Sequence, residues 1–324
     1  MRHFFLAALI AISGFFISAQ AQPVAYPVRP VTMVIPYPPG GPTDAIGRLL
    51  ASRLATRLGQ PVVVENKSGA GSNIGAEYVA KAPADGYTLL FATSPALAIN
   101  TSLYTGLKYD PLTSFEPLVH AGSLPNVLLV HPSVKAKSVA DLVAISKTRE
   151  GGLSYASAGS GGTSHLAGVL FAKLTGAKLT HIPHRGTGPA LTSLLGGHTH
   201  LSFTDVLTAL PYIQSGRLNV LGVTSAEPSH VLPDAAPLAK QGLPDFDVSV
   251  FFGLVAPRGL PPAVRTRLST ELRAVLGEAE VQHQLKAKGL LLPAQTTPEY
   301  LREVMEKEVV QWAKLIRETG AKPE

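Results

Sequence analysis

Short apolar, β-branched runs alternate with amphipathic stretches along most of this chain, and this alternation constrains the fold more than any other feature. Residues 31–36, 62–64 and 88–91 are predicted strands, and residues 43–58 and 73–81 between them carry apolar side chains at helical spacing. Strands that alternate with helices build a mostly parallel sheet with helices on its faces. The first part of the chain is therefore predicted to be a β-α-β-α-β block.

A second block begins near Pro125, where the same alternation restarts. Its predicted strands are residues 127–130, 154–156, 179–182, 201–203 and 219–223. Its predicted helices are residues 139–148, 164–174, 189–195 and 207–214, the first of them capped by Ser138. After a strand at 250–255 the chain is predicted to be helical over 262–276, 281–288 and 298–318, and Thr296 and Glu299 have the spacing of a capping box for the last helix.

These C-terminal helices need a surface to pack on, and the simplest arrangement returns the chain to the first block. Domain 1 is therefore predicted to be discontinuous, with residues 22–124 and 249–324, and domain 2 to cover residues 125–248. The predicted fold is α/β, with two domains and a cleft between them.

The N-terminus has the pattern of a secretory signal. A short polar start precedes an apolar run over residues 4–17, and Ala19 and Ala21 supply small residues at the cleavage positions. The run is shorter than the roughly 20 residues of a membrane-spanning helix, so residues 1–21 are predicted to be a cleaved signal peptide rather than an anchor. The chain has no cysteine, which excludes disulfides and a lipid-modified cysteine. A freely diffusing exported protein follows.

Two loops share one design, in which a predicted strand runs into glycines and then directly into a helix. The first loop covers residues 37–44 and the second loop covers residues 157–164. Glycine lets a backbone approach a ligand closely, and the helix start offers unpaired N–H groups and a partial positive charge. The two loops are predicted to grip one anion from both sides of the cleft. Alternatively, they are ordinary turns in which Thr43 and Thr163 cap the helices.

Several side chains near these loops have two interpretations. Asp44 either stabilises its helix start through the helix dipole or recognises a polar group of the ligand. Asp205 ends a predicted strand, where ligand-facing residues of α/β sheets lie, and has the same two interpretations. A third loop, residues 183–189, contains Arg185, which either contacts a carboxylate or points to solvent.

Enzyme, cofactor and metal signatures are absent from the sequence. His181, His184, His198 and His200 crowd one stretch, but no acids or cysteines complete a tetrahedral metal site. Nucleophile-elbow, zinc-protease and P-loop motifs are missing, and the Gly69–Gly71 segment lacks the third glycine of a dinucleotide fingerprint. No catalytic residue, cofactor or metal is predicted, and the chain is predicted not to be an enzyme. A hydrolase that uses Ser160 or His165 is the alternative.

The net charge of +6 does not indicate a nucleic-acid partner, because Lys and Arg are scattered singly rather than gathered in one stripe. A mild positive balance suits a small anionic ligand or simple solubility.

The motifs together resemble one family, the receptors of tripartite tricarboxylate transporters, also called Bug receptors. The resemblance begins with residues 35–44 and continues through residues 64–71, 108–111 and 159–165 to residues 251–257 and the terminal helices. It covers the whole chain after the signal segment, and the motifs stand in the family order.

The resemblance implies a monomeric periplasmic binding protein that closes like a flytrap on a small carboxylate and delivers it to membrane permease subunits. A membrane sensor kinase is an alternative partner. It implies that the two glycine loops hold a carboxylate, and that Ser94 and Asp205 contact the distal part of the ligand. The ligand-binding residues predicted on all these grounds are Tyr37, Pro39, Gly40, Gly41, Thr43, Asp44, Ser94, Ser157, Ser160, Gly161, Gly162, Thr163, His184 and Asp205.

Two residues depart from the family pattern. Pro42 stands where a small residue is usual, and it removes one backbone donor unless it is simply the first helical residue. His184 stands where Tyr is common, and its protonation would add positive charge beside the ligand. The sequence leaves the identity of the carboxylate open.

Overall fold

The structure is a computed structural model and describes residues 26–323, so the predicted signal peptide lies outside the described residues. The strands are β1 (Val31–Ile35), β2 (Val62–Asn66), β3 (Thr88–Thr93), β4 (Phe115–Val130), β5 (Leu153–Ser157), β6 (Leu179–Pro183), β7 (Leu201–Asp205), β8 (Asn219–Val223) and β9 (Ser249–Pro257). The sheet order is β2-β1-β3-β9-β4-β7-β5-β6, and β8 also pairs with β4.

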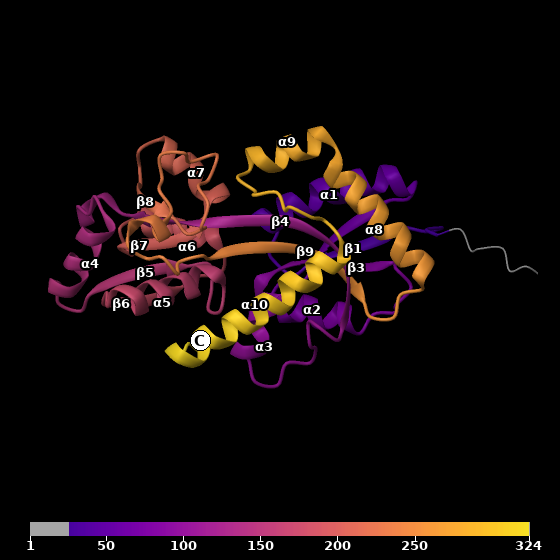
Figure 1. Cartoon of the computed structure of the whole chain (residues 1–324), viewed down its shortest axis with the longest axis horizontal. Coiled ribbons are helices and arrows are strands. Elements are labelled where there is room, and N and C mark those ends of the chain that lie inside the picture. The colour runs from indigo at the N-terminus through magenta and orange to yellow at the C-terminus, as the bar shows by residue number, and fades with distance from the viewer. Residues whose placement is uncertain (1–25, 324) are drawn as a thin grey trace, which may run out of the picture.

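Helices cover this sheet in two lobes (Figure 1). The first lobe is built around β1, β2 and β3, and the second lobe around β5, β6, β7 and β8. The helices are α1 (Pro42–Leu58), α2 (Asn73–Ala80), α3 (Asn100–Leu103), α4 (Val139–Thr148), α5 (Thr163–Thr175), α6 (Thr187–Leu195), α7 (Val206–Gln214), α8 (Pro262–Gly277), α9 (Ala279–Ala287) and α10 (Pro298–Thr319). Short helical turns lie at Ala70–Ser72, Pro95–Ile99, Pro132–Val134 and Leu238–Gln241. Among residues 26–323, no helix combines the length and the apolar character needed to cross a membrane.

Within each lobe the β-α units pair in parallel, as the alternation predicts. In the first lobe β1 lies between β2 and β3 and runs parallel to both. In the second lobe β5 lies between β6 and β7 and runs parallel to both. The predicted strands and helices of both blocks are confirmed to within a few residues, except that the strand predicted at 127–130 is only the end of a longer one. Apolar side chains at the predicted helical spacing, such as Ile46, Leu50 and Leu54 of α1, are fully buried.

Two long strands, β4 and β9, connect the lobes and add antiparallel pairs to the sheet. β4 has 16 residues; its first part pairs with β9, from Phe115 opposite Pro257 onward, and its last part pairs with β7 and β8. The sequence predicted only residues 127–130 of this strand. Proline and glycine normally interrupt strands, and here Pro117 and Gly122 lie beside register shifts that accommodate them.

The strand directions determine which loops face each other. β3 is antiparallel to β9 and β9 is antiparallel to β4, so β3 runs in the same direction as β4, from the first lobe toward the second. β7 is antiparallel to β4 and therefore runs back toward the first lobe. Since β1 and β2 follow β3, and β5 and β6 follow β7, the carboxyl ends of all six strands point at the junction between the lobes.

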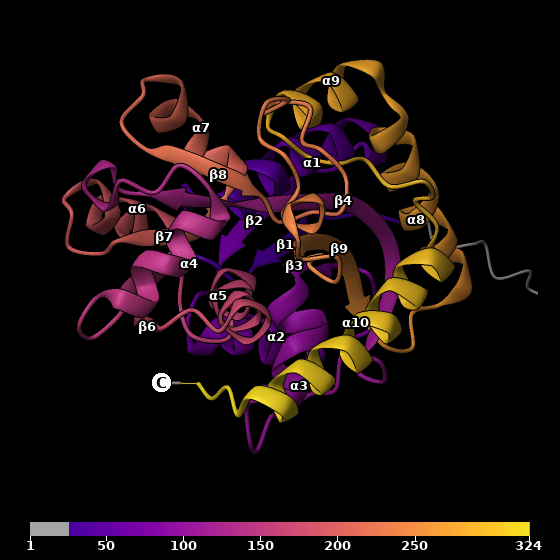
Figure 2. The same cartoon turned by 60° about the vertical axis from the view of Figure 1, so that its left-hand side comes forward.

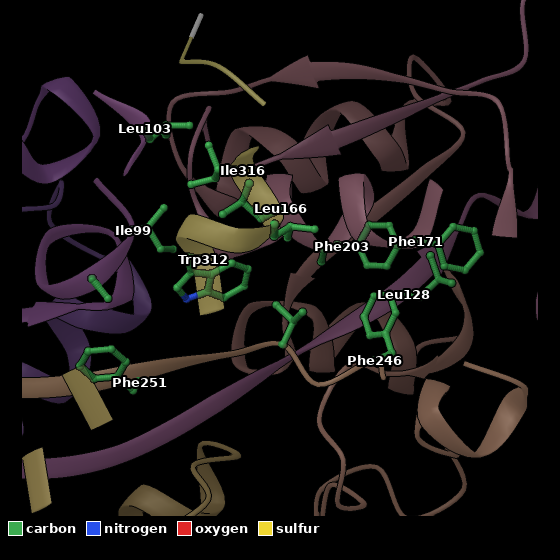
Figure 3. Packing of buried hydrophobic residues seen from close by; sticks show 14 of the residues in the cluster. Ile99, Leu103, Leu128, Leu166, Phe171, Phe203, Phe246, Phe251, Trp312 and Ile316 are labelled. Carbon is green, nitrogen blue, oxygen red and sulfur yellow. The ribbon is translucent and has the colours of Figure 1, made fainter. Parts of the chain in front are cut away.

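The last helix, α10, also spans both lobes. Its N-cap is Thr297, whose side chain accepts the Tyr300 N–H at 3.1 Å. The predicted capping box with Thr296 is therefore wrong by one residue, because Pro298 occupies the first helical position and sets the cap beside it. Figure 2 shows α10 passing along α3. In Figure 3, Trp312 of α10 lies between Ile99 of the first lobe and Leu166 of the second, and all three are buried. Of the C-terminal helices, α8 packs on α1 of the first lobe, and α10 contacts both lobes.

Candidate functional site

The first loop joins β1 to α1 and is held in shape by Asp44. The Asp44 carboxylate accepts the Gly40 N–H at 3.0 Å, the Arg48 Nε–H at 2.9 Å and the Asn66 Nδ2–H at 2.9 Å. Asn66 also donates to the carbonyl of Tyr37 at 3.0 Å. Both carboxylate oxygens are therefore engaged inside the loop, which favours the structural interpretation of Asp44.

The electrostatics of Asp44 agree with that role. Burial raises the pKa of its carboxyl, but the hydrogen bonds from Arg48, Gly40 and Asn66 outweigh burial and leave the pKa below its ordinary value. The carboxylate is charged at neutral pH and is compensated by Arg48, so its charge does not exclude an anion from the adjacent backbone.

The caps of the two loop helices are glycines rather than the threonines of the alternative interpretation. α1 begins after Gly41, with Pro42 in the first helical position, and α5 begins after Gly162. Neither cap makes a side-chain hydrogen bond, because glycine has no side chain, and Thr43 and Thr163 lie inside the first turn. Pro42 sits where its missing N–H would be unpaired in any helix, so it costs the loop no intrahelical bond. The next N–H groups point out of each helix start.

The second loop joins β5 to α5 and is held by side chains at its two ends and by His165, which follows it. Ser164 accepts the Ala158 N–H at 3.0 Å, and His165 Nδ1 accepts the Gly161 N–H at 3.0 Å. Ser157 Oγ lies 3.2 Å from the Gly159 N. In contrast, Ser160 Oγ is buried and has no hydrogen-bond partner among residues 26–323, so it retains a free donor inside the loop.

The third loop packs beside the second. The His184 N–H donates to the Ser157 carbonyl at 3.1 Å and the Gly186 N–H donates to the Ala158 carbonyl at 3.0 Å. The His184 ring is partly exposed, with Nδ1 3.0 Å from the Ile182 carbonyl, and Arg185 is exposed. These contacts bring His184 to the edge of the second loop, as its predicted role requires.

Ser94 and Asp205, the two residues predicted to contact the distal part of a ligand, use their side chains inside the protein. Ser94 is fully buried and its Oγ accepts the Phe251 N–H at 3.1 Å. Asp205 caps α7 and accepts the N–H and the hydroxyl of Thr208, each at 2.8 Å. Burial raises the pKa of Asp205, although the Thr208 hydrogen bonds act against this. Both residues nevertheless follow strands that point at the junction.

Tyr37 and Pro39 complete the first loop. The Tyr37 hydroxyl lies 2.5 Å from Thr93 Oγ1 at the end of β3, so this ring bridges two of the strands that point at the junction. Burial raises the pKa of the Tyr37 hydroxyl, and it stays protonated. Pro39 is exposed at the loop tip.

The lobes touch at the second loop. A Cβ atom built on Gly161 would come within 2.0 Å of Cδ2 of Leu103, which belongs to α3 in the first lobe. On the second-lobe side, buried Asn126 of β4 donates to Thr163 Oγ1 at 3.3 Å and so connects the shared strand to the start of α5.

Asn66, Leu103 and Asn126 were not among the predicted site residues. The segment that contains Asn66 was noticed as a motif, but its partners Asp44 and Tyr37 are distant in sequence and only the fold identifies them. The clustered histidines have separate partners: His200 Nδ1 accepts the Ser154 N–H, and His181 stacks on His165. Among residues 26–323 no three His, Cys, Asp or Glu side chains gather as metal ligands would.

Known proteins match this chain along nearly its whole length. The family model described as tripartite tricarboxylate transporter family receptor matches residues 46–321. Protein BugT of Bordetella pertussis is 38% identical over 323 residues, which are 98% of this chain and 99% of BugT.

Solved structures match it as well. Rpa4515 of R. palustris with adipate has a TM-score of 0.87 at 35% identity and covers 92% of this chain and 100% of its own. MatC from Rhodopseudomonas palustris with bound malate has a TM-score of 0.83 at 30% identity and covers 90% of this chain and 100% of its own. The described structure is thus similar to those of periplasmic binding proteins.

Proposed function

Because this chain belongs to the tripartite tricarboxylate transporter receptor family, we propose that it is a periplasmic receptor for a small carboxylate. It captures the carboxylate between its two lobes and delivers it to the membrane subunits of a tripartite transporter. The observation that carries this proposal is the pair of glycine-capped helix starts, α1 and α5, on strands that point at each other across the junction. The adipate and malate bound to structural relatives support the ligand class.

Backbone donors hold the carboxylate in this proposal. The first turn of α1 offers the N–H groups of Thr43 and Asp44, and the first turn of α5 offers those of Thr163 and Ser164. Ser160 Oγ adds a hydroxyl donor that has no other partner in the described chain. Hydrogen bonds to an ionised acceptor are stronger than neutral ones, and each helix start contributes roughly 0.3–1 kcal/mol to a nearby negative charge. No cationic side chain is required.

In this proposal the lobes close when the carboxylate binds and open when it is released. A ligand shifts a two-state equilibrium only by its difference in affinity for the two states. An anion contacts both helix starts only when the lobes are together, so it favours the closed arrangement in which Leu103 meets Gly161. β4 and β9 connect the lobes and are the segments that bend.

No chemical step belongs to this function. Ser160 Oγ has no hydrogen-bond partner among residues 26–323, so it is not activated by His165 as a serine nucleophile would be. The bound carboxylate is therefore expected to be released unchanged, which mass spectrometry of the released ligand would check.

The test is calorimetry with adipate and malate on the wild type and on Gly162→Leu. Gly162 has φ −71° and its nearest neighbour to a new Cβ is the Gly159 carbonyl at 3.4 Å, so the fold accepts a side chain there. Leucine covers the start of α5, and we expect binding to be lost with an unchanged circular dichroism spectrum. Gly277→Leu, at a position with open space around it, is the control. Unchanged affinity in Gly162→Leu would contradict the proposal.

A thermal-shift screen over di- and tricarboxylates, amino acids and aromatic acids identifies the ligand. Binding to the folded state alone stabilises it by about 2.7 kcal/mol at a ligand concentration of 100 Kd. Delivery is tested separately, by uptake into proteoliposomes that contain the transporter's membrane subunits with and without the receptor.

A further inference from the structure

Two histidines contact the glycine segment of the second loop, directly or through Ser157. His165 Nδ1 accepts the Gly161 N–H at 3.0 Å, and His181 Nε2 lies 2.6 Å from Ser157 Oγ. Ser157 Oγ in turn lies 3.2 Å from the Gly159 N. Both ends of the glycine segment are thus positioned by imidazoles on α5 and β6.

The two imidazoles form a stacked pair. Their centroids are 4.0 Å apart with an angle of 15° between the ring planes, and the Tyr155 ring lies 4.9 Å from His181 on β5. Neutral rings stack favourably at this distance, whereas two imidazolium charges this close repel each other. The arrangement therefore favours the uncharged pair.

The hydrogen bond to Gly161 requires one particular protonation state. A histidine nitrogen that accepts a hydrogen bond carries no proton, and an imidazolium has no accepting nitrogen. Protonating His165 would place two N–H donors opposite each other at the present 3.0 Å, so Gly161 would have to move. Gly161 cannot move far toward the first lobe, because Leu103 lies against it.

We propose that His165 and His181 are positioning residues for ligand capture, which hold the second loop in its binding shape only while the His165 imidazole is neutral, so that acid weakens carboxylate binding. The inference rests on the proposed receptor function and adds a regulation of the same site. Neither histidine needs to touch the ligand.

The surroundings of the two histidines also predict that acid weakens binding. Burial and, next, the charge of His184 lower the pKa of His181 to about 4. A lowered pKa means that this arrangement of the loop disfavours a proton on the imidazole. By linkage, a proton on the imidazole destabilises this arrangement, so the binding shape of the loop is lost in acid. Among residues 26–323, the titratable and charged groups around the pair include His184 on the third loop, Lys173 on α5 and Glu318 on α10, the last two joined by an ion pair of 2.5 Å.

Protons have a route to the pair. A groove of about 420 Å³ lies between α5, β6 and the end of α10, and both imidazoles line it together with Tyr155. Val169, Ala172 and Leu179 form its apolar wall, and the Lys173–Glu318 ion pair borders it. The groove therefore gives solvent access to the pair.

The first experiment is calorimetry with adipate and malate between pH 5 and pH 7.5 on the wild type, His165→Asn and His181→Phe. The asparagine oxygen can accept from Gly161 but does not titrate, and phenylalanine keeps the stack without a charge. Taking the affinity of each variant relative to the wild type at the same pH cancels the ionisation of the dicarboxylate.

We expect the wild type to lose roughly tenfold or more in affinity relative to His165→Asn on going from pH 7.5 to pH 5, because only a neutral His165 imidazole can accept the Gly161 N–H. His181→Phe loses the contact with Ser157 Oγ and should bind more weakly than the wild type at every pH, while its pH dependence, which His165 sets, should follow the wild type. The exposed His198→Asn is the control and should follow the wild type. If the affinities of the wild type and His165→Asn changed with pH in the same way, the inference would be overturned. It would also be overturned if the wild type bound more tightly in acid and this gain disappeared in His184→Asn.

A second measurement needs no ligand. In ¹⁵N NMR spectra we expect His165 Nδ1 to be unprotonated at pH 7.5 and the Gly161 amide signal to shift with the same midpoint as the His165 ring on acidification. A Gly161 signal that stays fixed while His165 titrates would overturn the inference. Failure of every carboxylate in the thermal-shift screen to bind at pH 7.5 would instead count against the proposed function, and the NMR result would still decide the role of His165.

Discussion

Leu103 and Gly161 lie against each other across the junction, closely enough that a Cβ atom on Gly161 would come within 2.0 Å of the Leu103 side chain. The glycine therefore has two roles. Its φ of +80° suits the loop, and its missing side chain lets the lobes meet.

Gly161→Ala should prevent full closure and weaken carboxylate binding by at least tenfold, with a stability loss of about 1–2 kcal/mol from the left-handed backbone. Calorimetry and small-angle scattering measure the two effects. Gly151→Ala is the matched control, because Gly151 has φ +72° and open space around it. Leu103→Ala in the Gly161→Ala background should restore affinity, and a double variant as weak as the single one would argue against the closure explanation.

Asp44 should be important for stability of the first loop. Asp44→Ala leaves the Gly40 N–H, Arg48 and the Asn66 amide without their shared acceptor, and we expect a loss of about 2–3 kcal/mol in urea unfolding. The exposed Asp234→Ala should change stability by less than about 0.5 kcal/mol. Because the folded-state pKa of Asp44 is lowered, its contribution is present above the ordinary carboxyl pKa and is lost in acid. A loss no larger than that of the control would contradict this role.

His120 predicts a second pH dependence of stability. Its ring is 4% exposed, neither nitrogen has a hydrogen-bond partner among residues 26–323, and burial lowers its pKa to about 4. The unfolded chain takes up the proton first, so stability is full above the ordinary pKa of about 6.5 and falls by about 3 kcal/mol as pH drops to about 4. His181 acts in the same direction.

His120→Phe removes this dependence and fills the space beside Phe251 and Tyr300, whose rings lie 6.1 and 5.4 Å away. The variant should be more stable than the wild type at pH 5, as measured by urea unfolding across the pH range. The same slope in both proteins would show that His120 does not carry the effect.

Glu308 and Trp312 predict an optical signal. Trp312 is the chain's one tryptophan, and its Nε1–H donates to Glu308 at 2.6 Å. Burial raises the pKa of Glu308 to about 7, while the Trp312 and Ser94 hydrogen bonds act against this. Tryptophan fluorescence should therefore titrate with a midpoint near pH 7.

Glu308→Gln should abolish that titration, since glutamine accepts the indole N–H without a charge. A raised carboxyl pKa means that stability is lost as pH rises from about 4.5 to 7, so the variant should be more stable than the wild type at pH 8, by about 1–2 kcal/mol. Exposed Glu306→Gln is the control. A titration that survives in Glu308→Gln would assign the signal to another group.

Local patterns predicted the elements of both blocks, because each strand or helix has its own periodicity. The full length of β4 was not predicted, since Pro117, Gly122 and Pro125 read as interruptions and only pairing with β9 and β7 shows that the strand continues. The caps at Thr43 and Thr163 were wrong because glycine takes the position before each helix.

The sequence predicted which loops form the candidate site, but it did not predict the contacts that hold these loops in place. The first and second loops follow from glycines placed between a strand and a helix. The contacts of Asn66 with Asp44, of His165 with Gly161 and of Leu103 with Gly161 depend on how the loops fold back and how the lobes meet. The exact domain boundaries remain a prediction, because β4, β9 and α10 belong to both lobes.

The strands β4 and β9, which connect the two lobes, also determine the order in which the lobes can fold. The second lobe's strands pair with one another and with the last part of β4, so residues 115–223 contain every one of its ladders. The first lobe is different: Leu90 of β3 pairs with Val255 of β9, and the first part of β4 pairs with β9 as well. Contacts between residues so distant in sequence form slowly. The lobe that is synthesised first is thus the one that finishes folding last, and it waits for the C-terminal quarter of the chain.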